Sequence, residues 1–163
     1  MDTNVLAVAE GLHDGASDEC VAACSRLARQ IQDGKILVAV DSEQSGEAVL
    51  REYLAVLNTR NKAGIGSKLA VRLWRLRHDS KVCRRVDINA VPGADTYQEV
   101  PADLHDFDPD DHKWIAIAAA DQEDPPIYQA HDKEWWERRE DFVRSGVDVQ
   151  FLCASDLVDD MDE

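Results

Sequence analysis

Long apolar runs are absent from this 163-residue sequence. No stretch reaches the roughly 18 to 20 apolar residues that a membrane-spanning helix needs. The first residues also lack the basic start and small-residue cleavage site of a secretory signal peptide. We therefore expect a soluble, cytoplasmic protein. The length suits one domain, which we place at residues 1–155, followed by an acidic tail at 156–163 that we expect to be disordered.

Cysteine and histidine are scarce, and neither shows the spacing of a familiar metal site. The four cysteines contain no C-x-x-C pair, and Cys20 and Cys24 lie one helical turn apart, where both face a core. This pattern favours buried thiols over disulfides or a zinc site. None of the five histidines has a ligand-like i, i+4 partner. We expect them to be polar surface or loop residues.

Basic residues are outnumbered, with 18 Lys and Arg against 33 Asp and Glu and a net charge of −15. This balance argues against nucleic-acid binding by the surface as a whole. Between Arg51 and Arg85, however, ten basic residues accompany two acids, a local charge of +8 that leaves −23 on the other residues. Such a strip can hold a phosphate backbone while the other faces repel it. Its candidate binding residues are Arg60, Lys62, Lys68, Arg72, Arg75 and Arg84.

Apolar runs of strand length alternate with helical patterns along the chain. Ser17 and Asp18 can cap a helix that ends near Gly34. The later helices are expected at 46–57, 67–78, 111–120 and 132–146, and the strands at 36–40, 83–91, 126–130 and 147–153. Strands separated by helices pair in parallel, because the helix supplies the crossover. We therefore expect an α/β fold, a three-layer α/β/α sandwich with a mainly parallel central sheet of the Rossmann-like kind.

The polar residues that follow the strand candidates are carboxylates, and none is a Ser, Cys or Lys nucleophile. In an open parallel sheet, ligands bind beyond the carboxyl ends of the strands. Several acids converging on one pocket repel each other, so they need cations or protons between them. Hard oxygen ligands suit Mg²⁺ or Mn²⁺, and such an ion can activate water for phosphodiester hydrolysis. The candidates are Asp2, Asp41, Glu52, Asp111, Asp132 and Glu134.

Four segments in order resemble the signature segments of the PIN-domain nucleases: DTNVL at 2–6, REYL at 51–54, DDHKWIAIA at 110–118 and HDKEW at 131–135. The similarity runs from Asp2 to about Cys153. It implies a metal-dependent nuclease that cleaves RNA, with structured DNA as the substrate in some branches. It also implies Asp2, Glu52, Asp111 and Asp132 as catalytic acids, with metal held by Asp2, Asp111, Asp132 and Glu134. Thr3 and Asn4 would then orient the first acid.

Structural interpretations compete with each of these roles. Asp111 and Asp132 can be helix caps, and Glu52 can be an exposed helix acid, with Glu47 as an alternative in the same helix. Trp135 and Trp136 can stack on bases, although adjacent helical residues point about 100° apart and at most one faces a site. The acids at 106, 108 and 110 do not form an EF-hand, because its central Gly and distal Glu are absent.

From these observations we expect a magnesium- or manganese-dependent endoribonuclease. The alternative is a catalytically inactive PIN-like module that binds RNA or a protein partner. The resemblance implies as further expectations an antitoxin or other regulatory protein that covers the acidic pocket, a toxin–antitoxin role and a homo-oligomer. PIN domains have a full strand before the first acid, whereas only Met1 precedes Asp2 here. We therefore expect either additional apolar residues upstream of Met1 or an incomplete metal site.

Overall fold

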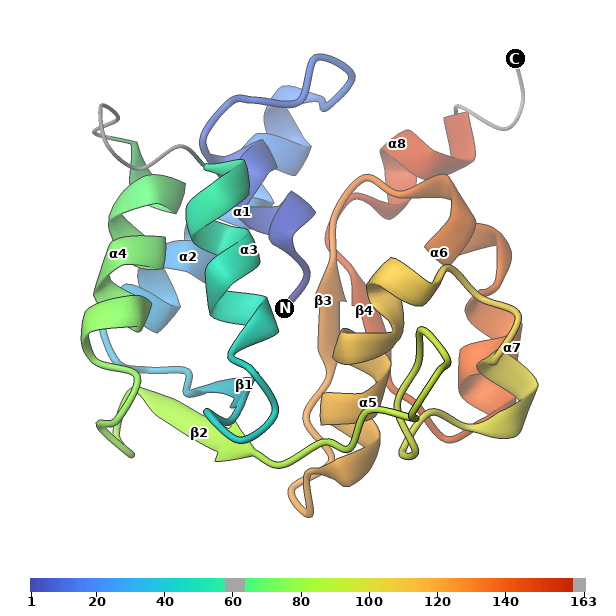
Figure 1. Cartoon of the computed structure of the whole chain (residues 1–163). Helices are drawn as coiled ribbons and strands as arrows, with labels where there is room; N and C mark the ends of the chain where they lie inside the picture. Colours follow the sequence, from blue (N-terminus) through green and yellow to red (C-terminus); the bar gives the residue numbers. More distant parts are fainter. Residues whose placement is uncertain (58–63, 160–163) are drawn as a thin grey trace.

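The structure of the chain is a computed structural model that describes residues 1–57 and 64–159. It mixes helices with small parallel sheets, consistent with the expected α/β class (Figure 1). The helices are α1 (Thr3–Ala9), α2 (Asp18–Gln32), α3 (Ala48–Val56), α4 (Ile65–Arg75), α5 (His112–Ala120), α6 (Lys133–Glu137), α7 (Arg139–Arg144) and α8 (Ala154–Asp159). The strands are β1 (Val38–Asp41), β2 (Cys83–Val86), β3 (Ile127–Gln129) and β4 (Val149–Phe151).

The strands form two parallel pairs rather than the single central sheet that we expected. β1 pairs with β2, with Val38 opposite Cys83, and β3 pairs with β4, with Ile127 opposite Val149. α5 contacts both β1 and β3, so one helix covers both pairs. Within the part of the chain that the structure describes, no strand joins β1 to β3.

The N-terminus lies between the two pairs, as Figure 1 shows. Asp2 is not at the end of a strand; it is the N-cap of α1, and its backbone N–H donates to the Tyr128 carbonyl of β3 at 2.9 Å. Beside Met1 is an apolar groove of about 110 Å³ between β1 and β3. It is lined by Met1, Ile31, Ile36, Leu37, Val38, Ala39, Trp114, Ile117, Ala118, Pro125, Pro126, Ile127 and Tyr128. The α-amino group of Met1 is buried, and this burial lowers its pKa to about 6.

The longest helix agrees with its sequence pattern. α2 begins after Ser17, whose hydroxyl accepts the Cys20 N–H, and it buries Cys20, Cys24, Leu27, Ala28 and Ile31. The basic helix α4 likewise buries Leu69 and Leu73 while Lys68 and Arg75 stay exposed. Both helices follow the 3.6-residue spacing of their apolar residues. None of the helices within 1–57 and 64–159 has the length and apolarity needed to cross a bilayer.

Two expectations near the C-terminus are corrected. The single helix expected at 132–146 is divided into α6 and α7 at Arg138, whose side chain pairs with Asp106 and Asp141. The disordered tail expected from Asp156 onward is helical through Asp159, because Leu157 is fully buried and Asp156 accepts hydrogen bonds from Ser17. Residues 160–163 lie outside the described part of the chain.

The cysteine prediction is corrected as well. Cys20 and Cys153 form a disulfide, while Cys24 and Cys83 are buried free thiols. The pairing joins residues 133 positions apart in the chain, so local spacing carried no signal for it.

Candidate carboxylate site

Two hydrogen bonds hold the Asp2 carboxylate at the start of α1. The carboxylate accepts the Asn4 backbone N–H at 3.2 Å and the Gln129 side-chain amide at 2.5 Å. Burial raises the pKa of Asp2, and the negative charge of Glu52 raises it further, while the two hydrogen bonds act in the opposite direction. The Asn4 side chain accepts the Ala130 N–H and so ties α1 to the end of β3. Asp2 is therefore a buried, oriented acid, as expected, although a helix cap rather than a strand end positions it.

Asp111 lies in the turn that leads into α5. The competing interpretation of Asp111 as a helix cap is not met, since its side chain makes no capping hydrogen bond to α5. The Asp111 carboxylate instead accepts the Trp135 indole N–H at 2.9 Å. Burial, followed by the negative charge of Asp2 and a smaller effect of Asp132, raises the pKa of Asp111 to about 7. A carboxyl group so perturbed by other acids is a candidate functional group rather than a simple cap.

Glu52 points from α3 toward α1 and α5. Its two carboxylate oxygens have different partners: the Thr3 hydroxyl donates to Oε1 at 2.5 Å, and Lys113 Nζ lies 2.7 Å from Oε2. Thr3 therefore orients Glu52 and not Asp2. Sequence reasoning missed Lys113, although its place two residues after Asp111 in α5 puts it at the same helix end.

Asp132 caps α6 by accepting the backbone N–H groups of Glu134 and Trp135. Its charge raises the pKa of Asp111, so the capping role and a place in the carboxylate site coexist. Glu134 is largely exposed. The small part of it that is buried raises its pKa, and the negative charges of Asp108 and Asp132 raise it further. Asp132 and Glu134 thus lie at the solvent-facing edge of the site.

The structure brings the predicted acids into one electrostatically coupled group. The negative charges of Asp2 and Asp132 raise the pKa of Asp111, and the negative charge of Glu52 raises the pKa of Asp2. Among residues 1–57 and 64–159, two groups of three residues have ligand atoms within 4.8 Å of one another: Cys20, Cys24 and Cys153, and Glu43, Glu47 and His78. The predicted acids are in neither group, so their carboxylates are farther apart than the ligands of a closed metal site. The carboxylate chemistry fits Mg²⁺ or Mn²⁺, which keep several water ligands and need only one or two protein carboxylates.

The two alternative acids have structural roles. Asp41 accepts the N–H groups of Ala48 and Val49 at 2.6 and 3.0 Å and so caps α3. Glu47 is buried and pairs with Arg77 at 2.9 Å. Glu52, rather than Glu47, is the α3 acid that reaches the site.

Part of the basic strip is occupied by ion pairs. Arg84 Nε lies 2.5 Å from Oδ2 of the buried Asp121, so the Arg84 guanidinium already has an anionic partner within the protein. Lys68 and Arg75 are exposed on α4, and Arg72 is half-buried there. Arg60 and Lys62 lie outside the described residues. The described candidate cations that form no ion pair with another described residue, Lys68, Arg72 and Arg75, lie on α4, which contacts α1, α2 and α3.

The aromatic and histidine candidates divide between core and periphery. Trp135 is fully buried and stacks on Phe142, so it orients Asp111 instead of binding bases. The Trp136 ring packs edge-on against Phe151, and the Arg139 guanidinium carbon lies 4.7 Å from the centroid of the Trp136 ring. His112 is buried rather than at the surface, and its Nδ1 lies 2.7 Å from the Thr96 hydroxyl.

Comparisons of the chain with protein-family models, with curated proteins and with solved structures found no match.

Proposed function

We propose that the chain is a divalent-metal-dependent nuclease, an endoribonuclease, and that its two strand pairs belong to a PIN-like three-layer α/β/α architecture. The supporting observation is the buried position of Asp111 near Asp2 and Asp132: burial, followed by the negative charge of Asp2 and a smaller effect of Asp132, raises the pKa of Asp111 to about 7. Buried acids that destabilise each other in this way are characteristic of sites that bind cations or transfer protons. Asp111 makes no capping hydrogen bond to α5; its carboxylate accepts the Trp135 indole N–H instead.

In this proposal Asp2, Asp111, Asp132 and Glu134 hold Mg²⁺ or Mn²⁺, and Glu52 assists from α3. The bound ion supplies an activated water and a positive charge beside the scissile phosphate. Gln129 and Asn4 hold the Asp2 carboxylate in one orientation, and the Trp135 indole does the same for Asp111. Lys113 neutralises Glu52 while the metal is absent.

The proposed substrate is single-stranded RNA, gripped through its phosphates by Lys68, Arg72 and Arg75 on α4. The rest of the surface is acidic and repels a polyanion, so binding depends on this local cationic face. DNA is the alternative substrate, and a labelled DNA of the same sequence in the same assay distinguishes the two.

The test is cleavage of a labelled single-stranded RNA with Mg²⁺, with Mn²⁺ and with chelator. The wild-type chain should cleave only with metal, and Asp111→Asn and Asp2→Asn should each lower the rate by at least about a hundredfold. Asp148→Asn is the matched control, because Asp148 is an exposed acid beside β4. RNA binding without cleavage in the wild type would overturn the nuclease proposal in favour of an inactive binding module.

A further inference from the structure

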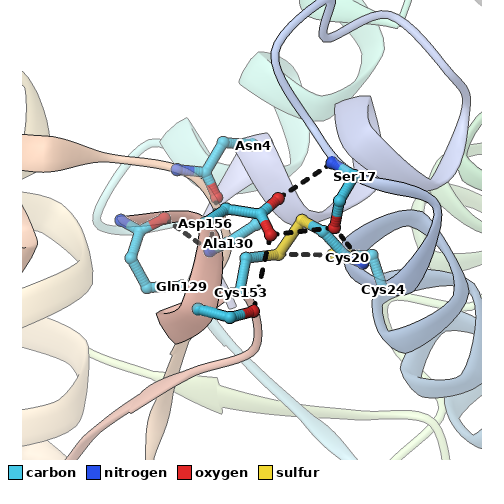
Figure 2. The surroundings of a disulfide bond; sticks show 9 residues. Asn4, Ser17, Cys20, Cys24, Gln129, Ala130, Cys153 and Asp156 are labelled. Carbon is cyan, nitrogen blue, oxygen red and sulfur yellow. Dashed lines mark hydrogen bonds between the residues drawn. A yellow bond between two sulfur atoms is a disulfide. The ribbon is translucent and has the colours of Figure 1, made fainter. Parts of the chain in front are cut away.

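Three buried cysteine sulfurs meet where α2 passes the segment between β4 and α8, shown in Figure 2. Cys20 and Cys24 lie on successive turns of α2, and Cys153 directly precedes α8. Cys20 and Cys153 are joined as a disulfide, and the Cys24 sulfur lies 4.0 Å from that of Cys153. All three sulfurs lie within 4.8 Å of one another. A disulfide uses two of them, so the third thiol has no part in the crosslink.

This sulfur spacing matches that of a metal thiolate site. Tetrahedral Zn²⁺ binds thiolates at about 2.3 Å, which places neighbouring sulfurs roughly 3.8 Å apart. Cys24 and Cys153 already have nearly this separation. Once the disulfide is reduced, the Cys20 sulfur needs only to move to roughly 3.8 Å from the Cys153 sulfur. Cys20 lies one turn before Cys24, so its side chain can make this movement without unwinding α2.

The electrostatic surroundings differ among the three sulfurs. Burial, followed by the negative charge of Asp156, raises the pKa of the Cys24 thiol to about 12, so Zn²⁺ itself must displace the proton of this thiol. Cys20 lies in the first turn of the 15-residue helix α2, at the positive end of its dipole. Its N–H is capped by the Ser17 hydroxyl, and the Asp156 carboxylate accepts both the N–H and the hydroxyl of Ser17 at 2.8 Å. Both oxygens of Asp156 accept hydrogen bonds from Ser17, and Asp156 lies outside the group of ligand atoms within 4.8 Å of one another, so water would supply the fourth ligand of a four-coordinate site.

We propose that, after reduction of the disulfide, Cys20, Cys24 and Cys153 bind one Zn²⁺ as a three-thiolate site. Two molecules of a small thiol reduce the disulfide, giving two cysteine thiols and one molecule of the oxidised reductant. Zn²⁺ then displaces one proton from each of the three thiols. The soft sulfur ligands distinguish this site from the carboxylate site, whose oxygen ligands select Mg²⁺ or Mn²⁺. The ion ties α2 to α8 under reducing conditions as the disulfide does under oxidising ones.

The experiment compares the reduced wild-type chain with Cys24→Ala and Cys83→Ala. Cys83 is a buried free thiol on β2 that does not belong to the cluster, so its variant is the matched control. A phosphine serves as reductant because it brings no competing thiolate. Zn²⁺ affinity is measured by competition with a chromophoric chelator, and Co²⁺ substitution reports sulfur ligands through thiolate-to-metal charge-transfer absorption, which a carboxylate site cannot produce.

The reduced wild type and Cys83→Ala should bind one Zn²⁺ per chain, show the Co²⁺–thiolate band and melt at a higher temperature with Zn²⁺ than without it. Cys24→Ala, which keeps both disulfide cysteines, should bind at least tenfold more weakly. The oxidised wild type should lack the thiolate band. Equal Zn²⁺ affinity of Cys24→Ala and wild type, or absence of the thiolate band from the reduced wild type while its circular dichroism shows it folded, would overturn the proposal.

Discussion

Lys113 Nζ lies 2.7 Å from Glu52 Oε2, an ion pair that joins α5 to α3 at the edge of the carboxylate site. The lysine side chain is only 10% exposed and the glutamate side chain 32%. The pair therefore places a cation among several acids. A divalent ion that entered the site would compete with this lysine for Glu52.

Replacing Lys113 should test this competition. Lys113→Met leaves the charge of Glu52 unbalanced, so the free energy of unfolding without metal should fall by about 1 to 3 kcal/mol. Mg²⁺ should restore part of the loss, because the ion replaces the missing charge. In the double variant with Glu52→Gln, most of the loss should disappear. Losses that simply add in a double-mutant cycle would show that the two side chains do not interact.

Asp111 should make the stability of the metal-free chain depend on pH. Its pKa is about 7 in the folded chain against 3.8 ordinarily, so between pH 4 and 7 the folded state binds more protons than the unfolded state. The free energy of unfolding should therefore fall as pH rises through this range. Asp111→Asn keeps an acceptor for the Trp135 indole and removes the titration. It should be at least about 1 kcal/mol more stable than wild type at pH 8, since one pKa unit corresponds to about 1.4 kcal/mol.

At pH 4 the two proteins should have nearly equal stability, because Asp111 is then neutral in the folded wild type. The Met1 amine, whose pKa is lowered to about 6, titrates in both and cancels in the comparison. Chemical denaturation at pH 4, 6 and 8 measures the difference. A stability difference that does not change with pH would show that the pKa of Asp111 is not raised in the folded chain.

The basic face of α4 should control the salt dependence of RNA binding. Lys68→Glu with Arg75→Glu should weaken binding and reduce the slope of log K against log salt by about 1.4, the loss of two phosphate contacts on a single strand. Arg84 is excluded because reversing it would leave the buried Asp121 unpaired. Arg26→Glu with Lys35→Glu makes the same charge change at exposed positions outside the strip. An equal effect of the control pair would show that only the net charge matters.

The apolar groove between β1 and β3 should accept an added strand. β1 bonds to β2 through the N–H groups of Val38 and Ser42, so the backbone of Ala39 points the other way, toward the groove. Five alternating Val and Thr residues joined to Met1 can pair with this edge and replace the buried amine by an amide. The melting temperature should rise by on the order of 5 °C. Gly and Ser residues of the same number are the control; an equal rise with them would show that loss of the amine, not strand pairing, stabilises the chain.

Local sequence was sufficient where local physics determines structure. The Ser17 cap and apolar spacing of α2 predict that helix, because capping and burial act within a few turns. The short apolar runs around Val38 and Ile127 likewise predict strands. The resemblance to PIN-domain segments selected Asp2, Glu52, Asp111 and Asp132. In the structure the charge of Glu52 raises the pKa of Asp2, and those of Asp2 and Asp132 raise the pKa of Asp111, while the catalytic roles of these acids stay predictions.

Tertiary structure alone decided which of several chemically equal side chains meet. Glu47 and Glu52 share one helix, yet Arg77 takes the first and Lys113 the second. The Trp135 indole reaches Asp111, 24 positions earlier, and Cys153 meets Cys20 rather than Cys83. These partners are set by the packing of elements distant in the chain, and helix periodicity or charge counts contain no information about such distances. The sequence by itself determined elements such as α2 and α4 and the kinds of side chain they carry, because caps and apolar spacing act locally. The packed fold determined α1, α8 and the division at Arg138, and it determined which side chains act together.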